Sequence, residues 1–258
     1  MQSKSEVKDS FKLLLFASLL TLVLWFIPLA GVITYPIRLF VTFIHETGHA
    51  LAALATLGGV KRIALDWNGS GQTLTLGGWG FLISSAGYLT TTLYGSALLL
   101  FLRRQRNART AAIATGVMLL VITALFGGNV VAWLAGLVFG AGCLFLGVKG
   151  NPKVTHFCMS FLAIQCLLNA FYDLRALLYL STFDPEFLTD AQNMSQATGG
   201  LLPPVVWAAG WALLSAAVVV ATLVIYYRSL RQRALLLPES QSPLLIADSA
   251  VQSARWQG

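Results

Sequence analysis

Long apolar stretches recur along most of this 258-residue chain. A hydrocarbon core of about 30 Å is crossed by a helix of roughly 17 to 25 apolar residues, and these stretches reach that length. Soluble domains carry about 25% charged residues, whereas this chain has 10% charged and 57% hydrophobic residues. The composition therefore excludes a water-soluble globule and predicts an all-α polytopic membrane protein.

The breaks between the apolar stretches divide the chain into seven expected spans. Each break carries Pro, Gly, Asn or charged residues, which end helices. Residues 110–148 are open to two interpretations, two full spans or one broken helix, because their only break is a short Gly-Gly-Asn. One membrane-embedded domain is expected over residues 1–228, and a mobile polar tail over 229–258. The expected spans cover residues of about 11–32, 36–58, 79–102, 110–127, 129–148, 155–180 and 203–227.

Basic residues gather at the ends of the expected spans and in the segment 103–109, which holds four arginines. Together with a net charge of +7, this placement suits anionic lipid headgroups better than nucleic acid. The lipid bilayer is therefore an expected partner, and nucleic acid is not. With seven spans, the positive-inside rule makes the side of Arg38 and of the arginine segment cytoplasmic.

Two segments between the spans differ from plain connectors. In residues 61–77, the alternating stretch 72–76 follows an Asn-Gly-Ser-Gly turn, which predicts a short β-hairpin after the second span. Residues 181–202 contain three of the chain's ten acids and predict a polar loop. The hairpin would open on the side opposite to the arginine segment.

The motif with the strongest chemical content is His45-Glu46-Thr47-Gly48-His49, in the middle of the second expected span. On a helix the two histidines lie at positions i and i+4 on one face, so both imidazoles reach one metal ion. Glu46 lies beside them, where a general base is needed. Ionisable groups at mid-bilayer cost roughly 2.5 kcal/mol or more unless they are paired or functional, which favours a metal site over a packed polar cluster.

A catalytic zinc site takes three protein ligands, so a third ligand must come from elsewhere in the chain. Apart from Glu46, Asp173 is the only acid inside an expected span, and elimination makes it the candidate. Asn169 lies one turn earlier and is a candidate to orient the carboxylate or to donate to an oxyanion. The alternatives are that Asp173 is an interfacial acid beside Arg175 and that Asn169 only packs against neighbouring helices. His156 is expected to be an interfacial histidine rather than a ligand.

The third expected span carries four small residues in a row: Ser84, Ser85, Ala86 and Gly87. Small residues allow two membrane helices to approach closely. This stretch is therefore expected to pack beside the helix of the His motif, and it is assigned no chemistry.

Three stretches of the chain resemble the site-2 protease family of intramembrane zinc peptidases, in its small bacterial and plant branch without PDZ domains. They are FIHETGHALAALATLGGVKRI, SSAGYLTTTLYG after the Gly-rich hairpin, and LLNAFYDL. The resemblance covers residues of about 35–100 and 155–210. The chain departs from the family pattern after Asp173, where Leu174 stands in place of the usual glycine.

The resemblance implies a core of three helices in which His45 and His49 bind Zn2+ and Glu46 is the catalytic base. It assigns an aspartate ligand to a later helix, which matches Asp173, and it makes the hairpin a holder for an unwound substrate segment. It also implies a multi-pass protein of the bacterial cytoplasmic membrane, with a site that faces the cytoplasm. The charge distribution points to the opposite orientation, so the orientation stays open, as does the oligomeric state.

These features predict an intramembrane zinc metalloprotease that hydrolyses peptide bonds in or near the transmembrane segments of membrane proteins. Its expected catalytic residues are Glu46 and Asn169, and its expected metal ligands are His45, His49 and Asp173. Two alternatives stay open. One is a catalytically inactive relative that binds membrane clients, and the other is a metal transporter with the same side chains along its pathway.

Overall fold

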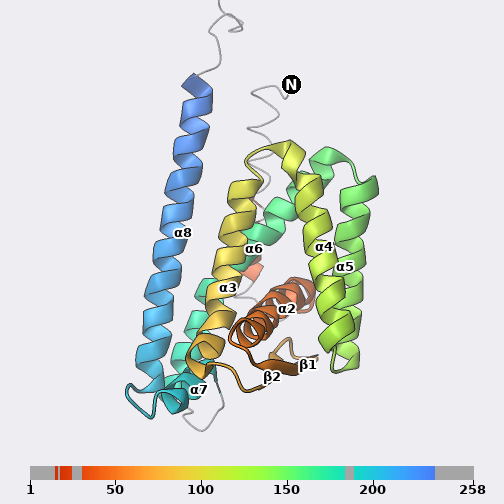
Figure 1. The fold of residues 1–258 in the computed structure, drawn as a ribbon. Helices are drawn as coiled ribbons and strands as arrows, with labels where there is room; N and C mark the ends of the chain where they lie inside the picture. Colours follow the sequence, from red (N-terminus) through yellow and green to blue (C-terminus); the bar gives the residue numbers. More distant parts are fainter. Residues whose placement is uncertain (1–14, 17, 25–30, 184–188, 236–258) are drawn as a thin grey trace, which may run out of the picture. The chain divides into compact units, whose positions relative to one another are not determined.

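The computed structural model describes residues 15–16, 18–24, 31–183 and 189–235, and it consists of helices with one small hairpin (Figure 1). Of residues 31, 33, 169–183 and 230–235 the backbone alone is described. The described residues fall into two compact units that meet between residues 220 and 221, and the expected boundary at residue 228 stays a prediction. The elements are α2 (Gly31–Ala55), β1 (Gly59–Leu65), β2 (Gly71–Leu76), α3 (Gly80–Phe101), the short 3-10 helix η2 (Gln105–Asn107), α4 (Ala108–Phe126), α5 (Val130–Lys149), α6 (Pro152–Phe183), α7 (Asp190–Ala197) and α8 (Pro204–Leu235).

Three helices among the described residues are long and apolar enough to cross a membrane: Gln105–Phe126, Val130–Lys149 and Pro204–Ser229. Helices α2 and α3 are also long but are not among these three, since α2 carries Arg38, Glu46 and two histidines, and α3 carries several serine and threonine residues. The helical fold with a hairpin is thus confirmed, while the count of seven spans stays a prediction. The first expected span, about 11–32, lies partly outside the described residues.

Residues 110–148 form two helices rather than one broken helix. The side chain of Asn129 begins α5 by accepting a hydrogen bond from the N–H of Ala132 (3.0 Å), a common cap for a helix N-terminus. Helices α4 and α5 run side by side (Figure 1), and glycines allow this, since a Cβ on Gly116 would lie 2.7 Å from the carbonyl oxygen of Gly140. Small residues are the usual means of close helix approach in membranes.

The expected hairpin is confirmed, because β1 and β2 pair antiparallel with Ile63 opposite Thr73. The other edge of β1 is bound by the turn between α4 and α5. The N–H of Gly128 donates to the carbonyl of Ile63 (2.7 Å), and the Asn129 amide bonds both the N–H (3.3 Å) and the C=O (2.8 Å) of Leu65. Buried backbone groups need hydrogen-bond partners, and this turn supplies them along β1.

The N-terminal half of α2 lies at the centre of the apolar core. Phe40, Phe43 and Ile44 are buried, and they belong to one cluster with Ile63 and Leu65 of β1 and with side chains of α4 and α5. Figure 1 shows α2 between α3 on one side and the α4–α5 pair on the other. The helix is therefore held firmly where the His motif begins.

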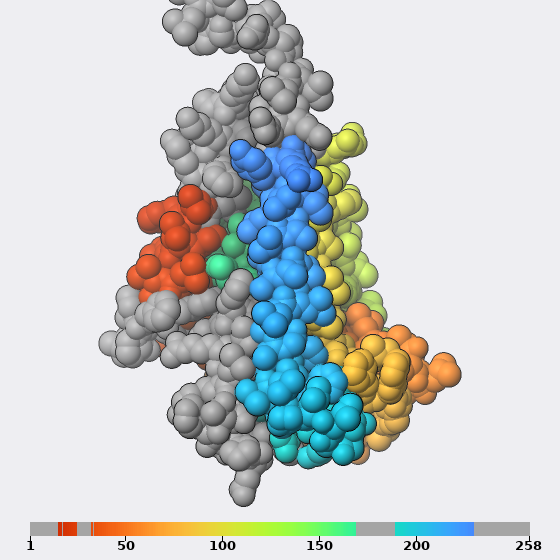
Figure 2. Space-filling view, turned by 90° about the vertical axis from the view of Figure 1, so that its left-hand side faces the viewer, coloured from red at the N-terminus to blue at the C-terminus, as the bar shows by residue number. Residues whose placement is uncertain are grey.

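The segment 181–202 differs from the predicted loop, because its described part is largely helical. Thr189 caps α7 by accepting a hydrogen bond from the N–H of Gln192 (3.2 Å), and Met194 is buried in one cluster with Trp211 of α8. The segment has few apolar residues, so its helix forms through a cap and tertiary packing rather than through a visible apolar period. Figure 2 shows α7 and the first turns of α8, in cyan, beside the amber segment that leads from the hairpin into α3.

Replacement of Asn129 by Ala should lower the melting temperature of the protein in detergent, because it removes hydrogen bonds to both backbone groups of Leu65 and to Ala132. The expected loss in the free energy of unfolding is about 1–3 kcal/mol. As a control, Asn107→Ala removes one exposed hydrogen bond to the carbonyl of Phe101 and should change stability by less than about 0.5 kcal/mol. Equal melting temperatures of Asn129→Ala and wild type would contradict this role.

Candidate metal centre

Two histidines of α2 converge because they lie one helical turn apart. His45 and His49 share one face of the helix, and their Nε2 atoms are 3.1 Å apart. Both side chains are largely buried, with 13% and 8% of their area exposed. The pair offers two nitrogen atoms to a single point between α2 and its neighbours.

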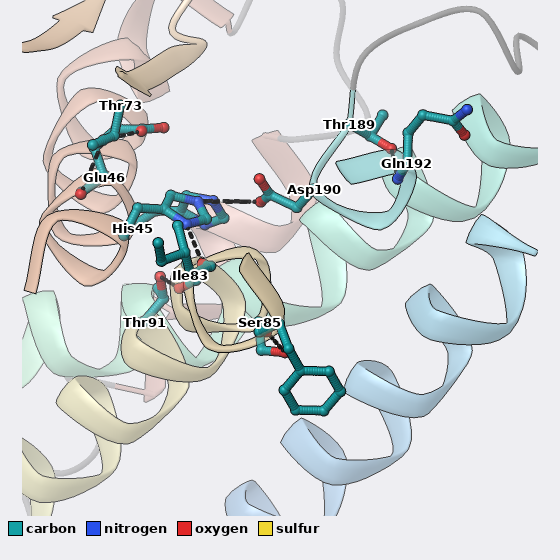
Figure 3. Close-up of polar contacts among 12 residues, drawn as sticks. His45, Glu46, Thr73, Ile83, Ser85, Thr91, Thr189, Asp190 and Gln192 are labelled. Atoms are coloured by element: carbon teal, nitrogen blue, oxygen red, sulfur yellow. Dashed lines mark hydrogen bonds and ion pairs between the residues drawn. The ribbon is translucent and has the colours of Figure 1, made fainter. Parts of the chain in front are cut away.

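Asp190, the first residue of α7, completes this group (Figure 3). Its Oδ2 atom lies 3.0 Å from His45 Nε2 and 3.3 Å from His49 Nε2, although 145 residues separate it from His45. Burial raises the pKa of the Asp190 carboxyl group, but the charge of His49 and hydrogen bonds from both imidazoles outweigh burial and hold that pKa well below its usual value. Asp190 is therefore an anion at neutral pH.

The three atoms are arranged as ligands of one metal ion. A tetrahedral ion with ligand bonds of about 2.0–2.1 Å keeps its ligand atoms about 3.3 Å apart, and the observed separations run from 3.0 to 3.3 Å. Two imidazole nitrogens and a carboxylate oxygen are also a donor set that zinc accepts. In the described part of the chain, His45, His49 and Asp190 are the group that could hold a metal.

Contacts from α3 and α8 orient the two imidazoles. The Nδ1–H of His49 donates to the carbonyl oxygen of Ile83 (2.7 Å), which leaves Nε2 as the ring atom that can bind a metal ion, and such a second contact is usual for metal-binding histidines. The ring of His45 lies edge-on to Tyr88, with centroids 4.8 Å apart, and Tyr88 stacks on Trp211 of α8. Neither imidazole ring depends on α2 alone for its position.

Gly87 on α3 makes room for the histidine pair. A Cβ at this position would overlap the Nε2 atoms of both His45 and His49. The neighbouring Ser84 and Ser85 are buried as well. The close approach expected from this run of small residues is therefore present, and the ligand atoms themselves require it.

Glu46 is buried beside the histidine pair, with 4% of its area exposed. Its Oε2 atom accepts a hydrogen bond of 2.6 Å from the hydroxyl group of Thr73 on β2 (Figure 3). Its Oε1 atom faces Gly71, where a Cβ would come within 2.7 Å. The hairpin therefore lies over the carboxylate, and position 71 has to be a residue without a side chain.

The structure brings together the part of the predicted site that lies on one helix. His45, Glu46 and His49 meet as their spacing predicts. Asn169 and Asp173 lie in α6, but their side chains are outside the described residues. Their roles as oxyanion donor and third ligand stay predictions.

Two residues of the site, Thr73 and Asp190, have no role of their own in the sequence-based prediction, and Gly87 has only a packing role there. The segment of Asp190 is predicted as a loop, outside the spans that are searched for a ligand. The available signal is Thr189 directly before an acid, a pattern typical of a helix N-terminus. For Thr73, no local pattern indicates contact with Glu46, because the contact depends on how the hairpin folds over α2.

Two histidines one turn apart, a carboxylate and an adjacent glutamate, enclosed by helices, match the set of side chains found in metal-dependent peptidases. The family described as Peptidase M50B-like matches residues 15–222 of the chain, a range that includes all of these residues. The chain therefore belongs to the Peptidase M50B-like family, and its resemblance to the site-2 proteases is confirmed. Comparisons with curated proteins and with solved structures gave no match. Membership of this family and three apolar helices together indicate a membrane-bound peptidase.

Gly87→Ala should reduce the metal content of the purified protein, because the new methyl group displaces the ligand atoms of His45 and His49. Gly142→Ala on α5 is the matched control, since a Cβ there meets nothing within 4 Å, and it should keep the wild-type content. Elemental analysis after purification in detergent measures both. Wild-type metal content in Gly87→Ala would show that the ion is held elsewhere.

Proposed function

We propose that this chain is an intramembrane zinc metalloprotease that hydrolyses peptide bonds in or near the transmembrane segments of other membrane proteins. The observation that carries the proposal is the approach of Asp190 to His45 and His49, with Glu46 beside them, in a member of a peptidase family. A location in the bacterial cytoplasmic membrane, with several membrane passes, is part of the proposal and rests on the resemblance to small bacterial site-2 proteases.

In this proposal His45, His49 and Asp190 are the zinc ligands. They supply the three protein ligands of a catalytic zinc site, which leaves the fourth position to water or substrate. Asp173 is the alternative third ligand, on the basis of its place in an apolar span. Asp190 is favoured because its carboxylate oxygen lies 3.0 Å from His45 Nε2. Asn169 is proposed, as before, to donate to the developing oxyanion.

Glu46 is the proposed general base. Its carboxylate takes a proton from the attacking water and passes it to the leaving amine of the cleaved peptide bond. A bound zinc ion supplies the Lewis acid that polarises the scissile carbonyl group. Ile83 holds the ring of His49 through Nδ1, which keeps Nε2 directed at the metal position.

The proposed substrate is an extended stretch of another membrane protein. Cleavage requires exposed backbone, and an extended peptide can join an open sheet edge as a further strand. Gly128 and Asn129 fill the outer edge of β1, whereas no other segment in the described ranges hydrogen-bonds to the outer edge of β2. A substrate strand on β2 would lie beside Thr73 and therefore beside Glu46.

Purified protein should hold about one zinc ion per chain, and Asp190→Asn should weaken zinc binding by more than about 10-fold. The loss follows because the amide lacks the negative charge of the carboxylate. Asp173→Asn is the matched variant and should retain zinc, and competition with a zinc chelator measures both affinities. Weak zinc binding in Asp173→Asn with normal binding in Asp190→Asn would reverse the assignment of the third ligand.

Glu46→Gln should retain zinc but lose cleavage by about 10²- to 10⁴-fold, because an amide keeps the size of the side chain and cannot take a proton. Labelled casein and synthetic transmembrane peptides, incubated with detergent-purified protein, measure the activity. If the protein is an inactive binder, even the wild type will leave both probes intact. A transporter would instead move zinc across liposome membranes and cut neither probe.

A further inference from the structure

Thr73 connects the open edge of β2 with the glutamate of the site. In an antiparallel pair, residues that lie opposite each other are alternately hydrogen-bonded and not hydrogen-bonded. Ile63 directs its carbonyl group away from β2, since it accepts the N–H of Gly128 (2.7 Å). Thr73 lies opposite Ile63, so the backbone N–H and C=O of Thr73 face the open edge.

The side chain of Thr73 reaches the carboxylate of Glu46 (Figure 3). Its Oγ1 atom donates to Oε2 at 2.6 Å and also lies 3.1 Å from the backbone carbonyl oxygen of Glu46. A hydrogen bond from a hydroxyl group to a carboxylate is short and roughly twice as strong as a neutral one. One oxygen of Glu46 is therefore held, and the oxygen that faces Gly71 is left to accept a proton.

The hairpin has other attachments that keep it in place. Thr42 and Arg38 on α2 donate to backbone carbonyl groups of the hairpin turn, at 2.8 and 3.0 Å. On the far side, Asn129 holds the outer edge of β1. Loss of the Thr73 hydroxyl group should therefore leave β2 where it is and remove only the bond to Glu46.

We propose that Thr73 is a positioning residue, whose hydroxyl group aligns the Glu46 carboxylate with a substrate strand that pairs with the backbone of Thr73 itself. This inference rests on the proposed peptidase function and adds a residue to it. Because a single residue contacts both the substrate backbone and the base, the register of the strand on β2 selects the peptide bond that is presented to Glu46.

The test compares Thr73→Val and Thr73→Ser with the wild type, in zinc-loaded full-length protein. Valine keeps the branched shape of threonine without its hydroxyl group, and serine keeps the hydroxyl group. We expect kcat on labelled casein and on transmembrane peptides to fall about 10- to 100-fold in Thr73→Val, with KM and zinc content unchanged, and to recover in Thr73→Ser. Thr115→Val removes a hydroxyl contact of 2.7 Å with Tyr94 at the α3–α4 contact, and it should keep the wild-type kcat.

Wild-type kcat in Thr73→Val would overturn the inference and leave the peptidase proposal intact. A rise in KM at constant kcat in Thr73→Val would overturn it too, since Thr73 would then only bind substrate. A loss of kcat in Thr73→Ser as large as that in Thr73→Val would also overturn it, because serine keeps the hydroxyl group. Loss of zinc in Thr73→Val would show that Thr73 has a structural role, and this result would also overturn the inference. If the wild type cuts neither probe, the peptidase proposal fails and the inference fails with it.

Discussion

A carboxylate and two imidazoles lie largely buried together between helices, and the rest of the structure depends on partners for these groups and for the adjacent glutamate. Ionisable groups removed from water are costly unless they are paired. Each partner comes from a different element: Asp190 from α7 contacts the histidines, Thr73 from β2 contacts Glu46, and the Ile83 carbonyl from α3 contacts His49. The arrangement of α3, α7 and the hairpin around α2 thus follows from what these four side chains require.

The same requirement explains why the two edges of the hairpin differ. An unpaired backbone group buried in the protein costs free energy comparable to a lost hydrogen bond, and Gly128 and Asn129 remove that cost along β1. The outer edge of β2 has no such cover in the part of the chain that the structure describes. Sheet edges are usually covered or blunted unless a partner strand joins them. The difference between the edges, more than the presence of a hairpin, favours β2 as the place for a substrate strand.

Local sequence predicts the parts of the site that short-range geometry determines. The spacing of His45 and His49 requires only a helix, and the hairpin requires only a turn between two strands. The proposed third ligand, Asp190, depends on tertiary structure, because α7 is a helix with few apolar residues that forms against α3 and α8. A search for acids within apolar spans therefore selects Asp173 and passes over Asp190. The polar residues of the site lower the hydropathy of α2, and serine and threonine residues lower that of α3, so length and composition identify α4 and α5 as spans more readily than the helices at the centre.

The position of Asp190 on α7 links metal binding to the docking of that helix. A helix of eight residues is not stable alone, and α7 relies on contacts such as that of Met194 in one cluster with Trp211. An ion held by Asp190 and the histidines would add its binding free energy to this docking, whereas movement of α7 would remove one of the three proposed ligands. Trp211 also stacks on Tyr88, which packs against the ring of His45. The start of α8 therefore touches both the helix that supplies the carboxylate and the aromatic neighbour of an imidazole, so a shift there alters two supports of the metal centre at once.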